Sequence, residues 1–393
     1  MKTIQKVIVC AAICTLACSC SDNSLKKTSD NPSEFLTDDA KIALVHSLKA
    51  LDGDRFLEMD YTLDYDLDEM IDYNCDSFEK FLEYLCTHMM DVAPSAGSLP
   101  APSSGCSAFA TTNKDTGDKL MGRNYDFCHV ENGEEVPITA LMIKTSPKNG
   151  KKSISMADSY WLGYKKGFYS DGKSDLSMLI GAPYSVLDGM NEDGFAVGVL
   201  HLLGNPTAQN DPAKKTIWSS VLMRVMLDRA STVDEAIEIA KTYNLNLVNP
   251  ADGSSHLFLA DAAGNYAILE YTFEPGADVD SSVPNRLIAL QGEKNSYVTN
   301  FYVDPDLADN AFLGGKSEKG MARYLILKGT LWLNAYKLTE EQAKDLLKAV
   351  SQTVKPEENT SHTQWSALYN LTQKTMDVSL LREFDKTFSF KVE

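Results

Sequence analysis

The sequence of 393 residues has few of the features that would assign it to a class at once. After residue 20 it contains no run of about 18 apolar residues, which a membrane-spanning helix would need. Basic residues are outnumbered: 37 Lys and Arg stand against 55 Asp and Glu, a formal net charge of −18. This charge argues against nucleic acid and anionic membrane surfaces as partners. The chain is long enough for one large domain with a substantial core.

Cysteine is also scarce in the part of the chain expected to fold. Four of the eight cysteines lie in residues 1–20, which leaves Cys75, Cys86, Cys106 and Cys128. No two of these have the C-x-x-C spacing of a structural zinc site, so we expect no metal and no cofactor. In an exported chain Cys75 and Cys86 could form a disulfide, and Cys128 would then be left over if Cys106 is a free thiol.

Residues 1–20 have the pattern of a secretion signal, in which a basic start precedes an apolar run over 7–17 and small residues follow. Cys18 and Cys20 stand before the polar residues 21–23 as in a bacterial lipoprotein cleavage site, with Cys20 the expected lipidated residue. The alternative is an ordinary signal that happens to contain cysteines. We expect an exported lipoprotein of the cell envelope, in the periplasm or on the outer-membrane surface, held to the membrane by its lipid only.

Residues 21–105 differ from the rest and indicate a polar tether followed by a pro-segment. Amphipathic patterns predict helices over 37–53 and 78–90. Between them, strict alternation over 57–67 predicts a strand with an acidic outer face. A stretch rich in Pro, Gly and Ser over 94–105 predicts an extended, flexible linker.

The linker ends at the Gly105–Cys106 bond, and the residues after it predict a hairpin. Strand-like composition to residue 112 is followed by turn residues over 113–118 and a returning strand. Pairing across this turn would bring Arg123 and Asp126 back beside Cys106. The alternative is a buried cysteine and an unrelated surface ion pair.

Cleavage of the Gly105–Cys106 bond would give Cys106 both a thiol and a free α-amine. An α-amine has an unperturbed pKa of about 7.7–8.0, so it can act as a base at neutral pH. A neighbouring guanidinium favours the thiolate, and a carboxylate can orient the ammonium group. This pattern is typical of an N-terminal-nucleophile (Ntn) hydrolase, which cuts its own chain to expose the nucleophile.

The order of motifs from Cys106 to the C-terminus resembles the choloylglycine hydrolase family, the cysteine branch of the Ntn hydrolases. That family includes bile salt hydrolases, penicillin V acylases and acid-ceramidase-like amidases. The resemblance rests on residues 106–109, 122–126, 188–198, 297–300 and 321–324. It implies an α+β fold, a four-layer αββα sandwich, over residues 106–393.

The resemblance also implies roles for individual residues. Cys106 would be the nucleophile, with Arg123 and Asp126 tuning and orienting it. Asn300 would serve the oxyanion hole, and Arg323 would support the site. Each of these residues has an ordinary alternative, such as a turn cap for Asn300 or a solvated helix position for Arg323.

Two further positions bear on the substrate. Where bile salt hydrolases have an asparagine, this chain has His201, which could donate a hydrogen bond to substrate or be a core histidine. Trp161 lies in an aromatic, glycine-jointed stretch over 159–169, which could line an apolar acyl pocket or be an ordinary strand and loop.

Downstream patterns complete the expected fold. Helices are expected over 217–229 and 317–332, and capping boxes at Thr232 and Thr339 should begin two more. Hairpins are expected over 257–271 and 365–380.

The expected reaction is attack of Cys106 on a linear amide, followed by a thioester acyl-enzyme and its hydrolysis. The substrate would be a small N-acyl amide, such as a conjugated bile acid or a fatty-acyl amino acid. Alternatives are an acyltransferase or a dipeptide-cleaving relative with the same thiol, and a surface lipoprotein that only binds a ligand. The patterns in 21–105 favour a pro-segment that is retained as a small subunit, and a homo-oligomer is left open.

Overall fold

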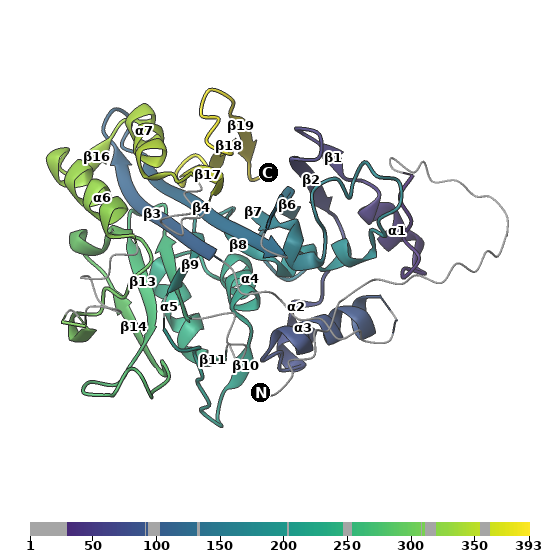
Figure 1. The fold of residues 1–393 in the computed structure, drawn as a ribbon, viewed down its shortest axis with the longest axis horizontal. Helices are drawn as coiled ribbons and strands as arrows, with labels where there is room; N and C mark the ends of the chain where they lie inside the picture. The colour runs from purple at the N-terminus through teal and green to yellow at the C-terminus, as the bar shows by residue number, and fades with distance from the viewer. Residues whose placement is uncertain are drawn as a thin grey trace.

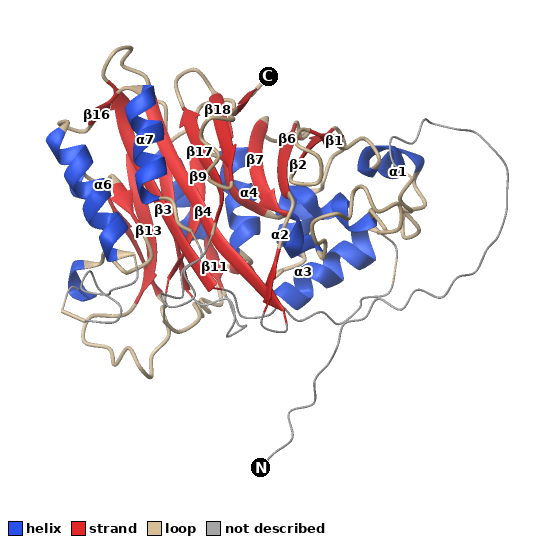
Figure 2. Cartoon of the chain, turned by 45° about the horizontal axis from the view of Figure 1, so that its top comes forward, coloured by secondary structure: helices blue, strands red, loops and turns tan. Residues whose placement is uncertain are grey.

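A computed structural model describes residues 30–90, 92, 103–131, 134–202, 204–246, 254–307, 309–310, 320–353 and 362–393. Two main β-sheets pack against each other, and helices lie on their outer sides (Figures 1 and 2). The expected α+β class is therefore confirmed.

The larger sheet has nine strands. In spatial order they are β1 (Lys49–Ala50), β2 (Phe56–Tyr61), β6 (Ala140–Thr145), β7 (Ser153–Asp158), β8 (Val186–Asn191), β9 (Ala196–Leu202), β12 (Ser254–Ala260), β13 (Tyr266–Thr272) and β14 (Arg286–Leu290). Neighbours are antiparallel except β2 and β6, which run parallel. The two strands from the N-terminal segment thus form one edge of this sheet.

The second sheet is built around the hairpin of β3 (Ser103–Asn113) and β4 (Lys119–Glu131). Its main order is β15 (Tyr297–Val298), β3, β4, β17 (Thr363–Asn370), β18 (Thr375–Leu380) and β19 (Phe388–Lys391), while β16 (Lys337–Leu338) pairs with β3 and β5 (Glu134–Val136) with β4. A separate pair is formed by β10 (Lys215–Ile217) and β11 (Tyr243–Leu245). Gly122 lets the hairpin close, because a Cβ there would lie 2.4 Å from the Phe109 ring.

The helices fall into two groups. On the outer side of the larger sheet lie α1 (Asp39–Val45), α2 (Leu67–Asp72), α3 (Phe78–Tyr84), α4 (Ser219–Arg229) and α5 (Val233–Thr242). On the outer side of the second sheet lie α6 (Met321–Leu333) and α7 (Glu340–Val350). Short 3-10 helices span Ser159–Leu162, Ser177–Tyr184, Glu293–Asn295 and Pro305–Leu307, and one π-helical turn, Leu85–Met89, extends α3.

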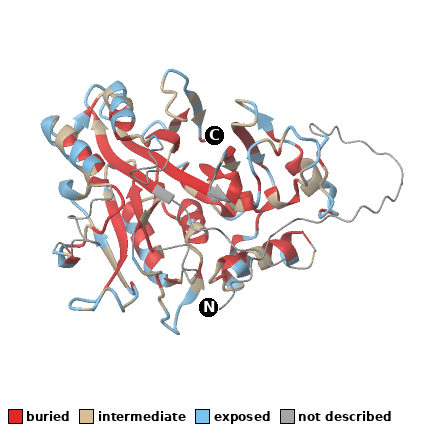
Figure 3. Ribbon diagram, in the orientation of Figure 1, coloured by how far each residue is buried: buried red, intermediate tan, exposed pale blue. Residues whose placement is uncertain are grey.

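Three apolar layers hold these elements together, as the buried strands of Figure 3 show. The layer between the sheets includes Met121, Tyr125, Met142, Phe258 and Trp365. Full burial of one such large side chain contributes about 1.5–3 kcal/mol. The N-terminal segment belongs to the layer under α4 and contributes buried residues from Leu36 to Met90. It is therefore part of the main core.

The N-terminal segment differs from its sequence prediction in two places. The first helix ends at Val45 instead of continuing to residue 53, because the chain turns to form β1. The strand expected over 57–67 ends at Tyr61. Its acidic side is exposed at Asp60, Asp64 and Asp66, as expected, but not at Glu58. Glu58 is 8% exposed, and its carboxylate pairs with Lys49 and Lys144.

Several local predictions are confirmed. The hairpins β12–β13 and β17–β18 are present, as are α4 and α6. The capping box at Thr339 is complete. At α5 only half of the expected box forms: the Thr232 side chain caps the helix, but the Glu235 carboxylate accepts from the Ser231 backbone N.

All four cysteines after residue 20 are free thiols, so the Cys75–Cys86 disulfide is not formed.

Within the described part of the chain, no helix is long and apolar enough to span a bilayer. The same residues bring no three His, Cys, Asp or Glu side chains together as metal ligands.

Candidate active site

The β3–β4 hairpin carries three of the site residues. In its register, Gly105 lies opposite Asp126, Cys106 opposite Tyr125, and Ala108 opposite Arg123. Arg123 Nη2 donates to Cys106 Sγ over 3.3 Å and also to the Val199 carbonyl, which fixes the guanidinium beside the sulfur. Burial alone would lower the pKa of Arg123, but the nearby Cys106 and Asp188 outweigh it and raise this pKa above its ordinary value.

Arg123 is packed too tightly to move away from the sulfur. A Cβ on Gly198 of β9 would lie 3.1 Å from Arg123 Nε and 3.2 Å from its Cδ. The guanidinium also donates to the Asn124 carbonyl. A fully buried guanidinium is thus held within hydrogen-bond distance of the Cys106 sulfur.

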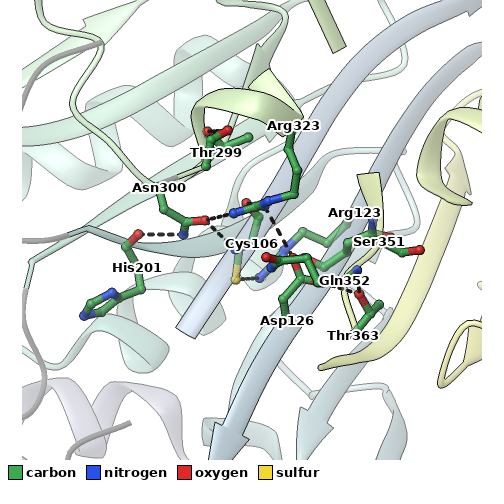
Figure 4. A network of polar contacts seen from close by, with 12 residues as sticks. Cys106, Arg123, Asp126, His201, Thr299, Asn300, Arg323, Ser351, Gln352 and Thr363 are labelled. Atoms are coloured by element: carbon green, nitrogen blue, oxygen red, sulfur yellow. Dashed lines mark hydrogen bonds and ion pairs between the residues drawn. The ribbon is translucent and has the colours of Figure 1, made fainter. Parts of the chain in front are cut away.

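Asn300 and Arg323 approach Cys106 from the other side (Figure 4). The Cys106 backbone N donates to Asn300 Oδ1 over 2.6 Å, and Asn300 Nδ2 donates to the His201 carbonyl over 2.8 Å. Arg323 Nη2 donates to the same Asn300 Oδ1 over 2.8 Å, and Nη1 to the Cys106 carbonyl over 2.5 Å. Asn300 Nδ2 has two hydrogens, and its bond to the His201 carbonyl uses one of them.

The Asp126 carboxylate is the third charged group of the network, and it is fully buried. Thr363 Oγ1 donates to its Oδ1 over 2.5 Å, and Gln352 Nε2 to its Oδ2 over 2.7 Å. Arg323 Nη1 lies 3.4 Å from Oδ2. Burial raises the pKa of Asp126 to about 6 against the lowering effects of Arg323, Thr363 and Gln352. Burial also lowers the pKa of Arg323.

Gln352 and Thr363 were not predicted from the sequence. Thr363 lies opposite Asp126 in the pairing of β17 with β4, and the Gln352 backbone N donates to its hydroxyl over 2.7 Å. Both residues are more than 220 positions from Asp126, so only the strand order could have indicated them.

Gln352 also packs against Gly105, the residue before Cys106. A Cβ on Gly105 would lie 2.5 Å from Gln352 Nε2 and 3.2 Å from Arg323 Nη2. The first distance is too short for a real contact, and Gln352 is held in place by Asp126. This site accommodates glycine before Cys106 because there is no room for a side chain.

Next to Cys106 lies a cavity of about 120 Å³ with an aromatic wall. Its lining includes Phe78 and Phe81 of α3, Tyr125 and Phe127 of β4, Trp161, Tyr184, Trp218, Met223, His201 and four serines. None of these lining residues is Lys, Arg, Asp or Glu. Such a surface suits an apolar, uncharged group.

The structure brings Cys106, Arg123, Asp126, Asn300 and Arg323 into one hydrogen-bonded network. The other predicted residues lie around this network. The His201 carbonyl accepts from Asn300, and His201 is one of the residues that line the cavity. Trp161 also lines the cavity and donates to the Tyr125 hydroxyl over 3.3 Å. Gly105 precedes the nucleophile, and Cys20 lies outside the described residues. The chemical role of each remains a prediction.

Comparison with known proteins gives one family match. Residues 106–314 match the model of the linear amide C-N hydrolases, choloylglycine hydrolase family. No curated protein matches the chain in sequence.

Solved structures with a similar fold include the penicillin V acylase from Agrobacterium tumefaciens, with 20% identity, a TM-score of 0.48, and coverage of 70% of this chain and 83% of that one. Two variants of the conjugated bile acid hydrolase from Clostridium perfringens are similar at 13% and 14% identity, with TM-scores of 0.48 and 0.49. Each match covers 73% of this chain and 92% of the other.

Proposed function

Because the chain belongs to the choloylglycine hydrolase family of linear amide C-N hydrolases, we propose that Cys106 is its N-terminal nucleophile, exposed by self-cleavage of the Gly105–Cys106 bond. The observation that carries this proposal is the geometry around Cys106. Its sulfur accepts from Arg123, its backbone N donates to Asn300, and its carbonyl accepts from Arg323. Both atoms that react in an Ntn hydrolase, the sulfur and the nitrogen, are held in place.

Self-cleavage begins when Sγ of Cys106 attacks the Gly105 carbonyl carbon. The acyl group moves from nitrogen to sulfur, and water then hydrolyses the thioester, leaving a carboxylate on Gly105 and an α-amine on Cys106. Asp126 lies opposite Gly105 in the hairpin register, beside the new amine. Its carboxylate would orient the ammonium form of that amine.

Amide hydrolysis repeats the same chemistry on a substrate. The α-amine takes the thiol proton, and the thiolate attacks the amide carbonyl carbon. Asn300 Nδ2 donates to the oxyanion, the C–N bond breaks, and the leaving amine takes the proton from the α-ammonium. Water, deprotonated by the α-amine, then hydrolyses the thioester and restores the thiol.

The substrate is an N-acyl amide with an apolar acyl group, of the conjugated bile acid or fatty-acyl amino acid type. The uncharged aromatic cavity beside Cys106 supports an apolar acyl group, and Trp161 would form part of its wall. The His201 ring, on the same lining, would contact the substrate near the amide.

The N-terminal segment stays bound after cleavage as a small subunit. Its β2 pairs with β6 along six residues, and Phe78 and Phe81 form part of the cavity wall. Loss of the segment would expose the edge of the nine-stranded sheet and open the cavity. Retention predicts that both fragments elute together from a sizing column under native conditions, whereas elution of the larger fragment alone would contradict it.

Export as a lipoprotein anchored at Cys20 is part of the same proposal and rests on the sequence of residues 1–20. Cys20→Ala should abolish incorporation of labelled palmitate into the protein when it is expressed in bacteria.

The hydrolase activity is tested with N-acyl amides that share one leaving amine and carry acyl groups of increasing apolar size. Wild type should release amine, and an acid-quenched reaction should contain the larger fragment with one added acyl group. The Cys106→Ala variant should do neither. Equal amine release by both proteins would refute a Cys106 mechanism.

A further inference from the structure

A buried histidine–glutamate pair lies outside the network around Cys106. His256 on β12 and Glu270 on β13 are opposite each other in the strand register, and both are 0% exposed. His256 Nδ1 lies 3.0 Å from Glu270 Oε1. Charged side chains are rarely buried without a partner, and this pair satisfies each side with the other.

The other side of the pair faces the segment that carries Asn300. His256 Nε2 lies 2.7 Å from the carbonyl oxygen of Thr299, the residue before Asn300. Glu270 accepts from the backbone N of Val303 over 2.8 Å and from that of Asp304 over 2.9 Å. The pair therefore binds the backbone on both sides of Asn300.

The hydrogen-bond roles follow from these partners. The Thr299 carbonyl can only accept, so His256 Nε2 carries a hydrogen. The Glu270 carboxyl accepts from two backbone N–H groups, one on each oxygen, and its Oε1 also faces His256 Nδ1. Both polar ends of the pair therefore have partners.

Asp304, the acidic residue in this segment, has partners of its own outside the His256–Glu270 pair. Its Oδ2 accepts from Thr272 Oγ1 over 2.8 Å and from Arg286 Nη2 over 2.5 Å. Asp304 thus adds a third link between the segment and the nine-stranded sheet. Among the described residues, the Asn300 side chain bonds to groups of the site, namely Cys106, Arg323 and the His201 carbonyl.

We propose that His256 and Glu270 are positioning residues that hold Asn300 at the nucleophile. This inference rests on the proposed function of Cys106 and Asn300. Both strands lie inside the nine-stranded sheet with a paired strand on each side, and the His256–Glu270 pair ties the 299–304 segment to them. If Asn300 were displaced by even 1 Å, it would lose its hydrogen bond to Cys106, and its Nδ2 would no longer be placed to donate to the oxyanion.

The first test compares two replacements of His256. His256→Leu removes both ring donors, whereas His256→Gln has an amide N–H that can still reach the Thr299 carbonyl. We expect His256→Leu to lower kcat for amide release by about 10- to 100-fold, below the roughly 10²- to 10³-fold loss seen when an oxyanion donor is itself removed. His256→Gln should recover most of kcat, and KM should be nearly unchanged in both.

A double-mutant cycle with Asn300→Ala separates positioning from a general loss of stability. If His256 acts through Asn300, the double variant His256→Leu/Asn300→Ala should be no slower than Asn300→Ala alone. His129→Leu is the matched control, because His129 is also buried and paired with a carboxylate, Asp158, but does not contact the 299–304 segment. In the double variant His129→Leu/Asn300→Ala, the loss of kcat should equal the product of the losses in the two single variants.

Rates are normalised to the fraction of chains that begin at Cys106. If His256→Leu does not fold, Glu270→Gln serves in the same cycle, because it keeps the size of the side chain and replaces the carboxyl group that faces His256 Nδ1. The positioning role would be overturned if the losses of kcat in His256→Leu and Asn300→Ala multiplied in the double variant. A wild-type kcat in His256→Leu would overturn it as well. A wild-type rate in Asn300→Ala would instead refute the role of Asn300 in the proposed function.

Discussion

Thr363→Val tests the environment of Asp126, because valine has nearly the shape of threonine and lacks its hydroxyl. The change removes the donor to Asp126 Oδ1 and the acceptor for the Gln352 backbone N. A hydrogen bond to a charged group contributes about 1.5–3 kcal/mol. We expect the free energy of unfolding at pH 8 to fall by about 2–3 kcal/mol.

The pH dependence gives the change a distinct signature. The folded-state pKa of Asp126, about 6, lies above its ordinary 3.8, so the protein loses stability as pH rises through 6 and Asp126 ionises. Thr363 lowers this pKa, so its removal should raise it further. The destabilisation by Thr363→Val should therefore be larger at pH 8 than at pH 5, where Asp126 is mostly protonated.

Activity provides the assay. If the Asp126 carboxylate orients the α-ammonium of Cys106, kcat/KM falls at acidic pH as Asp126 is protonated. Each pH unit corresponds to about 1.4 kcal/mol, so the loss of about 1.5–3 kcal/mol of carboxylate stabilisation should move the acid limb up by about one to two units in Thr363→Val. Thr145→Val, which loses a buried hydrogen bond to Ser153 far from Cys106, should leave the limb unchanged. Superimposed acid limbs for wild type and Thr363→Val would refute the reasoning.

Two further predictions concern Gly105, the residue before Cys106, and the cavity. Gly105→Ala should slow self-cleavage at least about tenfold, measured by intact mass over time, because its Cβ would meet Gln352 Nε2 at 2.5 Å. Gly329→Ala, in open space on α6, should be cut at the wild-type rate. Phe78→Ala should raise KM about tenfold with kcat nearly unchanged, since a lost apolar contact costs about 1–3 kcal/mol in binding. Phe35→Ala, 40% exposed and not on the cavity lining, should not change KM; equal effects would mean that Phe78 acts through stability.

Local sequence patterns were sufficient for the centre of the site. Turn residues after residue 112 predict the β3–β4 hairpin, and the hairpin alone places Arg123 and Asp126 near Cys106. Asn300 and Arg323 came from the resemblance to a family, because nothing in their own segments distinguishes them from a turn cap and a helix arginine.

The remaining contacts could not be predicted from the sequence, because they depend on the pairing of strands that are far apart in it. Thr363 reaches Asp126 only because β17 pairs with β4, and His256 reaches Thr299 only because β12 faces the 299–304 segment. The alternating pattern at β2 predicted an exposed acidic side, but Glu58 on that side is buried because it pairs with Lys49 and Lys144. Sequence periodicity describes one element and does not say what covers it.

The most direct test of the central claim is the intact mass and N-terminal sequence of purified wild type beside Cys106→Ala. Self-exposure of the nucleophile predicts that wild type contains a fragment beginning at Cys106, together with the smaller N-terminal fragment, and that Cys106→Ala remains one chain. If both proteins remain uncut, or if both are cut at the same bond, Cys106 does not cleave its own chain and the Ntn mechanism is contradicted.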